Sequence, residues 1–179
     1  MNLLLKYLAL GFVGLTLFAS CTETRYKEPQ PFEKKEKRSF PKKMQGTFID
    51  EDGDTFKIES ARIVGPVDNI GRTNSEIIEI SDSIKVKKHK GYCFLNALAD
   101  NNHWNVFLVD YSGRTNIHVY GIAPKTKRLR DLKRITKVEE FRNEKGKLKY
   151  ILLNPTKREW KHIIKEEIPE LVYSYRRIE

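Results

Sequence analysis

Cysteine is scarce in this chain. Only Cys21 and Cys93 occur among 179 residues. Cys93 lies in the apolar run 92–98, where a buried thiol behaves as a small hydrophobic side chain. We therefore expect Cys93 in the core, with a reactive or pairing thiol as the alternative.

The chain also lacks the usual signatures of catalysis. It has no Gly-x-Ser-x-Gly nucleophile elbow, no Gly-rich phosphate loop and no recognisable setting for the paired carboxylates of a glycoside hydrolase. Cys93 with His89, His103 or His118, or a serine with Asp110 and His118, could form a catalytic set only if the fold assembled it. The sequence thus predicts a non-catalytic protein, with an envelope hydrolase as the least supported alternative.

Metal-binding spacing is absent as well. The four histidines include no pair at a zinc-motif spacing. The acidic run 50–54 contains Gly53 too early for an EF-hand loop, and no glutamate closes twelve residues. We expect a solvated hairpin turn at 50–54, no metal and no cofactor.

The first twenty residues have the pattern of an export signal. Lys6 is followed by the run 7–18, which is apolar except for one threonine, and by small residues at 19 and 20. A membrane span needs about 20 apolar residues, which is more than this run supplies. Residues 1–20 are therefore predicted to be a cleaved signal peptide.

The sequence Leu17-Phe18-Ala19-Ser20-Cys21 resembles the lipobox of bacterial lipoprotein precursors, which is cut before its cysteine. The resemblance implies that Cys21 becomes a lipidated N-terminus, which attaches the protein to a membrane of the cell envelope. Thr22 supplies no acidic retention signal, so we expect the outer membrane, facing the periplasm. A lipidated Cys21 also leaves Cys93 without a disulfide partner. An ordinary secretory signal is the alternative.

Residues 21–43 are expected to be the lipid anchor and a disordered tether. The segment 22–43 contains three prolines, mixed charge and few apolar side chains, a composition that does not support a core. We expect it to be dispensable for folding and to hold the domain some tens of ångströms from the membrane, at up to about 3.3 Å per residue. The folded domain is predicted to span 44–179.

Period-two alternation between turn signals dominates that domain and predicts β-strands. The predicted strands are 45–50, 55–63, 76–80, 84–88, 92–98, 104–110, 116–122, 138–142, 148–153 and 171–178. An Asp-Gly pair in the acidic turn at 51–54 predicts a hairpin, and 65–75 reads as a long irregular loop.

Two helices are expected among these strands. Leu129, Leu132 and Ile135 have helical spacing within 126–135. Thr156 and Glu159 form a capping-box pattern that opens a second helix. That helix should carry one apolar stripe that packs on the sheet. The stripe is formed by Trp160, Ile163, Ile164 and Ile168.

The fold class is therefore mainly β, an antiparallel meander barrel or curved sheet with a C-terminal helix packed on it. This order loosely resembles the lipocalin architecture, a meander barrel followed by a helix and a final strand. Gln45-Gly46-Thr47-Phe48 is similar to the Gly-x-Trp opening of lipocalins. Aromatic and polar residues on the central strands form either a pocket or, as we favour, a core face: Tyr92, Phe94, Trp104, His118 and Tyr120.

The net charge of +10 is unevenly distributed. Residues 22–43 carry +4, residues 44–124 carry −3 and residues 125–179 carry +8. One short stretch concentrates six basic residues and is a candidate anion-contacting patch: Lys125, Lys127, Arg128, Arg130, Lys133 and Arg134. For an exported protein we expect anionic headgroups or another envelope protein as the partner, and no nucleic acid.

Together these features predict a lipid-anchored bacterial envelope protein whose β domain is a structural or protein-interaction module. A lipocalin-like carrier of a lipid or another apolar ligand is the alternative. A filled interior would favour the first, and an open apolar pocket of a few hundred Å³ the second.

Overall fold

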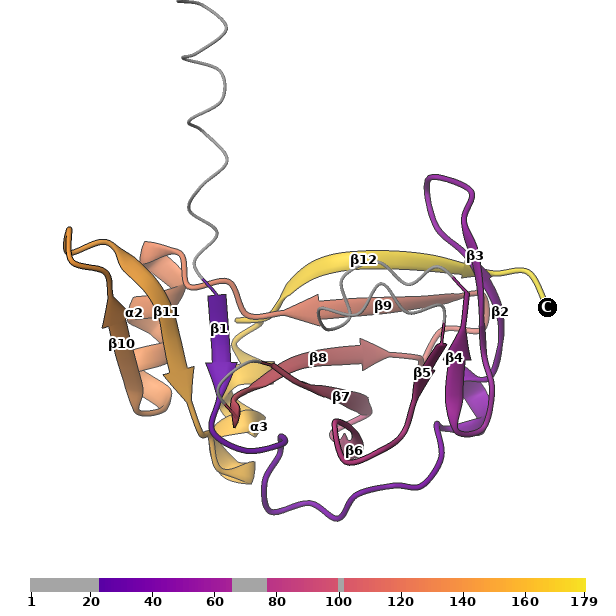
Figure 1. The fold of residues 1–179 in the computed structure, drawn as a ribbon, viewed down its shortest axis with the longest axis horizontal. Coiled ribbons are helices and arrows are strands. Elements are labelled where there is room, and N and C mark those ends of the chain that lie inside the picture. Colours follow the sequence, from indigo (N-terminus) through magenta and orange to yellow (C-terminus); the bar gives the residue numbers. More distant parts are fainter. Residues whose placement is uncertain (1–22, 66–76, 100–101) are drawn as a thin grey trace, which may run out of the picture.

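The computed structural model describes residues 23–65, 77–99 and 102–179 (Figure 1). Its strands are β1 (Glu23–Tyr26), β2 (Gly46–Ile49), β3 (Thr55–Ile58), β4 (Arg62–Val64), β5 (Ile77–Glu79), β6 (Ile84–His89), β7 (Tyr92–Leu98), β8 (Trp104–Asp110), β9 (Asn116–Gly121), β10 (Val138–Arg142), β11 (Leu148–Leu153) and β12 (Glu170–Arg177). Its helices are the short 3-10 helix η1 (Lys42–Met44), α2 (Thr126–Ile135) and α3 (Lys157–Lys165).

Most predicted elements occur at their predicted positions. β7, β8, α2, β10 and β11 have the expected bounds. The predicted strand 55–63 is instead two strands, because a turn at 59–62 lets the amide of Glu59 donate to the carbonyl of Arg62 at 2.8 Å. Apart from Gly65, the predicted loop 65–75 lies outside the described residues.

The mainly β class is confirmed, and the twelve described strands form one open, curved sheet. Its order is β10-β11-β1-β8-β9-β12-β2-β3-β4-β5, and β7 carries β6 on the other side of β8. The pairs are antiparallel except for β1 and β11, which run parallel, so the sheet is mixed and its ends do not close into a barrel.

Two hydrophobic cores fill the two sides of this sheet. The first is formed by Phe40, Met44, Phe48, Phe56, Ile58, Ile63, Ile78, Val86, Cys93, Leu95, Val109, Ile117 and Val119. The second lies beneath α3 and is formed by Tyr26, Phe94, Val106, Leu108, Ile122, Leu132, Ile151, Leu153, Trp160, Ile163 and Ile168. Cys93 and Leu95 of β7 enter the first core and Phe94 the second, because successive side chains of a strand point to opposite faces of the sheet. A hollow lined by the first core measures only about 30 Å³.

Helix α3 begins as the sequence predicts. The hydroxyl of Thr156 accepts from the amide of Glu159 at 3.2 Å, and the Glu159 carboxylate accepts from the amide of Thr156 at 2.7 Å. Trp160, Ile163 and Ile168 are almost completely buried. The predicted stripe therefore packs on the sheet through Trp160 and Ile163, whereas Ile164 is half-buried and Ile168 follows the end of the helix.

The prediction of a disordered tether is wrong for residues 23–43. β1 lies between β11 and β8, and Tyr26 is 1% exposed while Phe40 is 2% exposed. The aromatic ring of Tyr26 stacks on Trp160 with centroids 5.9 Å apart. These side chains enter cores that the rest of the chain builds. The low hydrophobicity of the segment itself is therefore no guide to whether it is ordered.

A buried polar network fastens the same segment to the sheet and to α3. The amide of Gln30 donates to Asn96 Oδ1 at 2.5 Å, and Asn96 Nδ2 donates back to the carbonyl of Gln30 at 3.1 Å. The indole of Trp160 donates to Gln30 Oε1 at 2.9 Å. Lys87 donates to the carbonyls of Pro29 and Pro31 at 2.8 and 3.3 Å. Residues 23–43 are thus an integral part of the domain.

Candidate functional site

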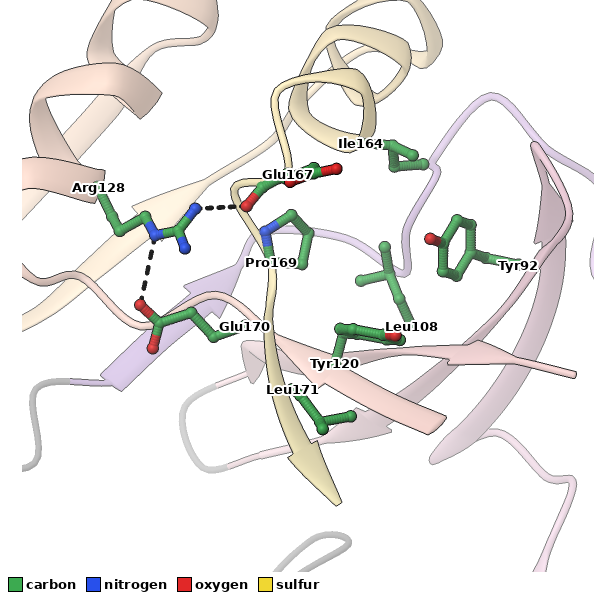
Figure 2. Close-up of a pocket in the computed structure, with 9 residues that line it drawn as sticks. All are labelled: Tyr92, Leu108, Tyr120, Arg128, Ile164, Glu167, Pro169, Glu170 and Leu171. Carbon is green, nitrogen blue, oxygen red and sulfur yellow. Dashed lines mark hydrogen bonds and ion pairs between the residues drawn. The ribbon is translucent and has the colours of Figure 1, made fainter. Parts of the chain in front are cut away.

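A surface cleft of about 400 Å³ opens where the end of α3 meets the start of β12 (Figure 2). Leu108 of β8 and Ile164 of α3 line it together with Pro169, which precedes β12. We call this opening the Tyr92 cleft, after the tyrosine on one wall. Its apolar lining belongs to the margin of the second core, which α3 leaves uncovered at its C-terminal end.

Two tyrosines form an aromatic wall. Tyr92 begins β7 and Tyr120 lies near the end of β9, and their rings meet edge to face with centroids 6.2 Å apart. Burial raises the pKa of Tyr92, and the nearby Asp110, Tyr120 and Glu167 raise it further. The phenol therefore stays protonated at neutral pH and can donate a hydrogen bond.

A β-bulge shapes the rim of the cleft. Leu171 pairs with Tyr120 and Tyr173 with Val119, so Val172 is an extra residue on β12. Such a bulge bends the strand and changes the direction of its side chains. Leu171 is 55% exposed and Val172 46% exposed, and this edge of the cleft is therefore an exposed apolar surface.

The opposite wall is charged but internally paired. Glu170 accepts from Lys125 at 2.7 Å. Its carboxylate also lies 3.3 Å from Arg128 Nε (Figure 2). The guanidinium of Arg128 also donates to the carbonyl of Glu167. The hydrogen bond from Lys125, with the positive charge of Arg128, lowers the pKa of Glu170 despite its partial burial. Glu170 is thus held as an anion and is poorly placed to exchange protons near neutral pH.

A second groove lies next to the Tyr92 cleft and shares the start of β12 with it. It measures about 550 Å³, is more open, and shares Glu170 and Leu171 with the Tyr92 cleft. Glu23 and Tyr26 of β1 line it together with Val172. The groove forms because β8 pairs with β1 at Trp104 and with β9 only from Leu108 onward. This pairing leaves a gap between β1 and β9.

The predicted aromatic face is partly core and partly cleft. Phe94 is fully buried and meets Trp160 edge to face, with centroids 4.9 Å apart. Trp104 packs at the margin of the same core, and His118 Nδ1 lies 3.1 Å from the hydroxyl of Ser174. Only Tyr92 and Tyr120 of the predicted set line the cleft. The core interpretation that the sequence favoured is therefore correct for the centre of the face.

The predicted basic patch surrounds α2, but acidic side chains pair with four of its members. Lys125 and Arg128 pair with Glu170, Lys133 with Glu140, and Arg134 with Asp131 and Glu166. Lys127 and Arg130 are exposed and have no ion-pair partner within the described part of the chain. The patch is thus partly neutralised, and two of its residues help to build the cleft instead.

The remaining predicted site residues give no second centre. Cys21 lies outside the described residues. Cys93 is buried and free, and burial raises its pKa to about 12, so the thiol is inert. The carboxylate of Asp50 accepts from the amides of Asp52 and Asp54 at 3.0 and 2.9 Å, which makes the acidic run a hairpin turn.

The described ranges contain neither a metal-binding cluster nor a helix that could span a membrane. No group of three or more His, Cys, Asp or Glu side chains there is arranged to hold a metal ion. None of the helices in the same ranges combines the length and hydrophobicity needed to cross a bilayer.

Comparison with known proteins does not identify a relative. No protein-family model, curated protein or solved structure matches this chain. The site must therefore be interpreted from its own geometry.

Sequence reasoning missed most of the cleft. Leu171 was assigned to a strand, but the bulge that exposes it left no signal in the residue pattern. Glu170 was not singled out, because its partners Lys125 and Arg128 are more than forty residues away. Pro169, which cannot continue a helix and follows α3, was a sign in the sequence of a change in direction near the site.

Proposed function

We propose that this protein is a lipid-anchored component of the bacterial cell envelope and that its β domain is a non-catalytic protein-interaction module. The Tyr92 cleft would hold an apolar or aromatic side chain of the partner. The anchor rests on the lipobox-like sequence that ends at Cys21. The interaction role rests on one observation, a cleft with an apolar and aromatic wall and a charged wall, whose rim is the exposed Leu171.

The geometry supports binding in two ways. An aromatic wall beside an apolar floor offers contact area at small entropic cost, since tyrosine has few rotatable bonds. Lys125 and Arg128 pair with Glu170, so the charges of this wall are already paired before a partner arrives. Preorganisation of this kind lowers the free-energy cost of association.

A small-ligand carrier remains a second candidate because of the cleft volume. About 400 Å³ falls in the usual range of about 300 to 1,000 Å³ for ligand pockets. The interior of the sheet is filled by two cores, so such a ligand would lie on the surface and not inside a barrel. Native mass spectrometry of protein purified from envelopes distinguishes the two, since a carrier should release a small apolar molecule on denaturation.

The anchor is tested by mass spectrometry of the membrane fraction. We expect a mature chain that begins at a lipid-modified Cys21 and a Cys21→Ser variant that leaves the membrane. A mature N-terminus at another residue would contradict this part of the proposal.

The cleft is tested by placing a photo-crosslinking amino acid at Leu171 in living cells, with the exposed Ile178 as the matched control. We expect a discrete crosslinked protein from position 171 only. With that partner purified, Leu171→Asp should weaken binding by about tenfold or more, equivalent to about 1.4 kcal/mol, while Ile178→Asp should have little effect. Equal loss in both variants would contradict a role for the cleft.

A further inference from the structure

The ordered N-terminal segment brings the proposed anchor close to one end of the domain. Only Thr22 separates Cys21 from Glu23, where β1 begins. Two residues of extended chain span at most about 7 Å. A lipid on Cys21 would therefore hold the start of β1 near the bilayer surface, in place of the long stand-off that a disordered tether would give.

The β10–β11 hairpin lies at the same end of the sheet. β1 and β11 run parallel with Glu23 opposite Tyr150, so the turn at 143–147 precedes β11 on the side from which β1 enters. In Figure 1 the hairpin, α2 and β1 gather at one end of the long axis, and β2, β3 and β4 lie at the other.

These two ends carry opposite charge. Residues 125–153, which we call the basic end, contain eleven lysines and arginines and four acidic residues. The far end, formed by 42–65, 77–83 and the end of β12 with the C-terminal residues (176–179), contains eight acidic residues and six basic ones, so it is only weakly acidic. The far end includes the acidic β2–β3 turn at 50–54.

Several cations of the basic end are available to a partner. Glu139 and Glu140 pair with Lys27, Lys133, Lys137 and Arg142. Exposed cations remain that have no acidic partner in the described ranges: Lys127, Arg130, Lys145, Lys147 and Lys149. Three of these five belong to the β10–β11 hairpin, whose strand β11 pairs with β1.

We propose that the anchored protein sits on the bilayer through its basic end, against anionic phospholipid headgroups, with the acidic β2–β3 turn at the other end of the long axis. This inference rests on the proposed lipid anchor at Cys21. Attraction to an anionic leaflet decays within a Debye length of about 8 Å at physiological salt. The short connection between Cys21 and β1 therefore matters. It keeps the hairpin lysines within this distance of the headgroups, while the far end remains beyond it.

The test uses the full, lipidated chain reconstituted into vesicles that contain nitroxide-labelled headgroups. A fluorophore is attached at Lys147→Cys in one sample and at Asp52→Cys in another. Cys93 is fully buried and stays unlabelled. On mixed phosphatidylglycerol and phosphatidylcholine vesicles we expect several-fold stronger quenching at position 147 than at position 52. The ratio should approach one on pure phosphatidylcholine or at high salt.

Charge-reversal variants provide the matched control. Lys145→Glu with Lys149→Glu should abolish the difference in quenching. Lys161→Glu with Lys165→Glu, the same change on the exposed face of α3, should preserve it. Equal quenching at positions 147 and 52 on anionic vesicles, or a difference that survives reversal of the hairpin charges, overturns the proposed seating. A chain without lipid at Cys21 overturns both this inference and the proposed anchor.

Discussion

Asn96 shows at the scale of one residue how the N-terminal segment is held. It is fully buried, and its amide satisfies both the backbone N–H and the carbonyl of Gln30. Each buried group left without a partner costs about 1 to 3 kcal/mol. A single polar side chain on β7 therefore contributes strongly to holding the segment against the sheet.

We predict that Asn96→Ala lowers the free energy of unfolding by about 2 kcal/mol or more, since it strands two buried backbone groups. Asn105→Ala, on the paired strand β8 and half-buried, should change stability by no more than about 0.5 kcal/mol. Urea denaturation measures both. Similar values for the two variants would mean that the Asn96 hydrogen bonds contribute little.

His89 predicts a specific pH dependence. Burial lowers its pKa, and the charges of Lys34, Lys90 and Lys157 lower it further, although a hydrogen bond with the Lys157 backbone acts in the opposite sense. Above about pH 6.5, the ordinary pKa of histidine, both folded and unfolded states are neutral. As the pH falls below this value the unfolded state binds the proton first, so stability declines.

Replacement of His89 by glutamine should therefore flatten the decline in stability that begins near pH 6.5. The carboxylates whose pKa is lowered by ion pairs, such as Glu140 and Glu170, lose their contribution only below their ordinary value of 4.5. Unfolding curves measured between pH 7 and pH 5 isolate the histidine. An unchanged slope in His89→Gln would contradict this assignment.

At the scale of elements, α3 connects the core, the cleft and the N-terminal segment. Trp160 is fully buried, stacks on Tyr26 and donates to Gln30. Ile164 lies on the same helix and lines the cleft. Loss of α3 would therefore disturb packing and the proposed site together.

We predict that Trp160→Ala costs about 3 to 5 kcal/mol of stability, the usual range for a large buried aromatic side chain. Thr156→Ala should cost about 1 kcal/mol through loss of the helix cap. The exposed Lys161→Ala should stay within about 0.5 kcal/mol. Thermal or chemical denaturation orders the three, and a Trp160→Ala variant as stable as Lys161→Ala would place the helix outside the core.

The N-terminal segment gives a second prediction for elements. A chain that begins at Glu23 should unfold cooperatively, because it retains β1 and the buried Tyr26 and Phe40. A chain that begins at Met44 should lose that transition, since it exposes Trp160 and leaves β11 without its parallel neighbour. Calorimetry compares them directly. A cooperative transition in the shorter chain would show that residues 23–43 are not required for folding.

For the whole molecule, Cys93 is a reporter of global opening. Its thiol lies in the first core, where burial raises its pKa to about 12. In a soluble Cys21→Ser chain we expect a thiol reagent to modify Cys93 only through global unfolding, with a rate that rises with denaturant as the unfolded population does. Rapid labelling that does not depend on denaturant would indicate local opening near β7.

The sequence alone determined the local elements. Alternation at 92–98 and 104–110 predicted β7 and β8, and Thr156 with Glu159 predicted the start of α3. These signals are readable because side-chain periodicity and helix capping involve residues only a few positions apart. The buried state of Cys93 was predictable for the same reason, since an apolar strand surrounds it.

Only the tertiary structure decided what these elements build. Tyr26 and Gln30 gain partners on α3 and β7 that lie at least sixty residues away, so a polar, proline-containing segment becomes part of the fold. The cleft likewise depends on the bulge at Val172 and on the pairing of Glu170 with Arg128. Composition describes whether a segment can form a core by itself, whereas order here comes from burial against surfaces that other segments supply.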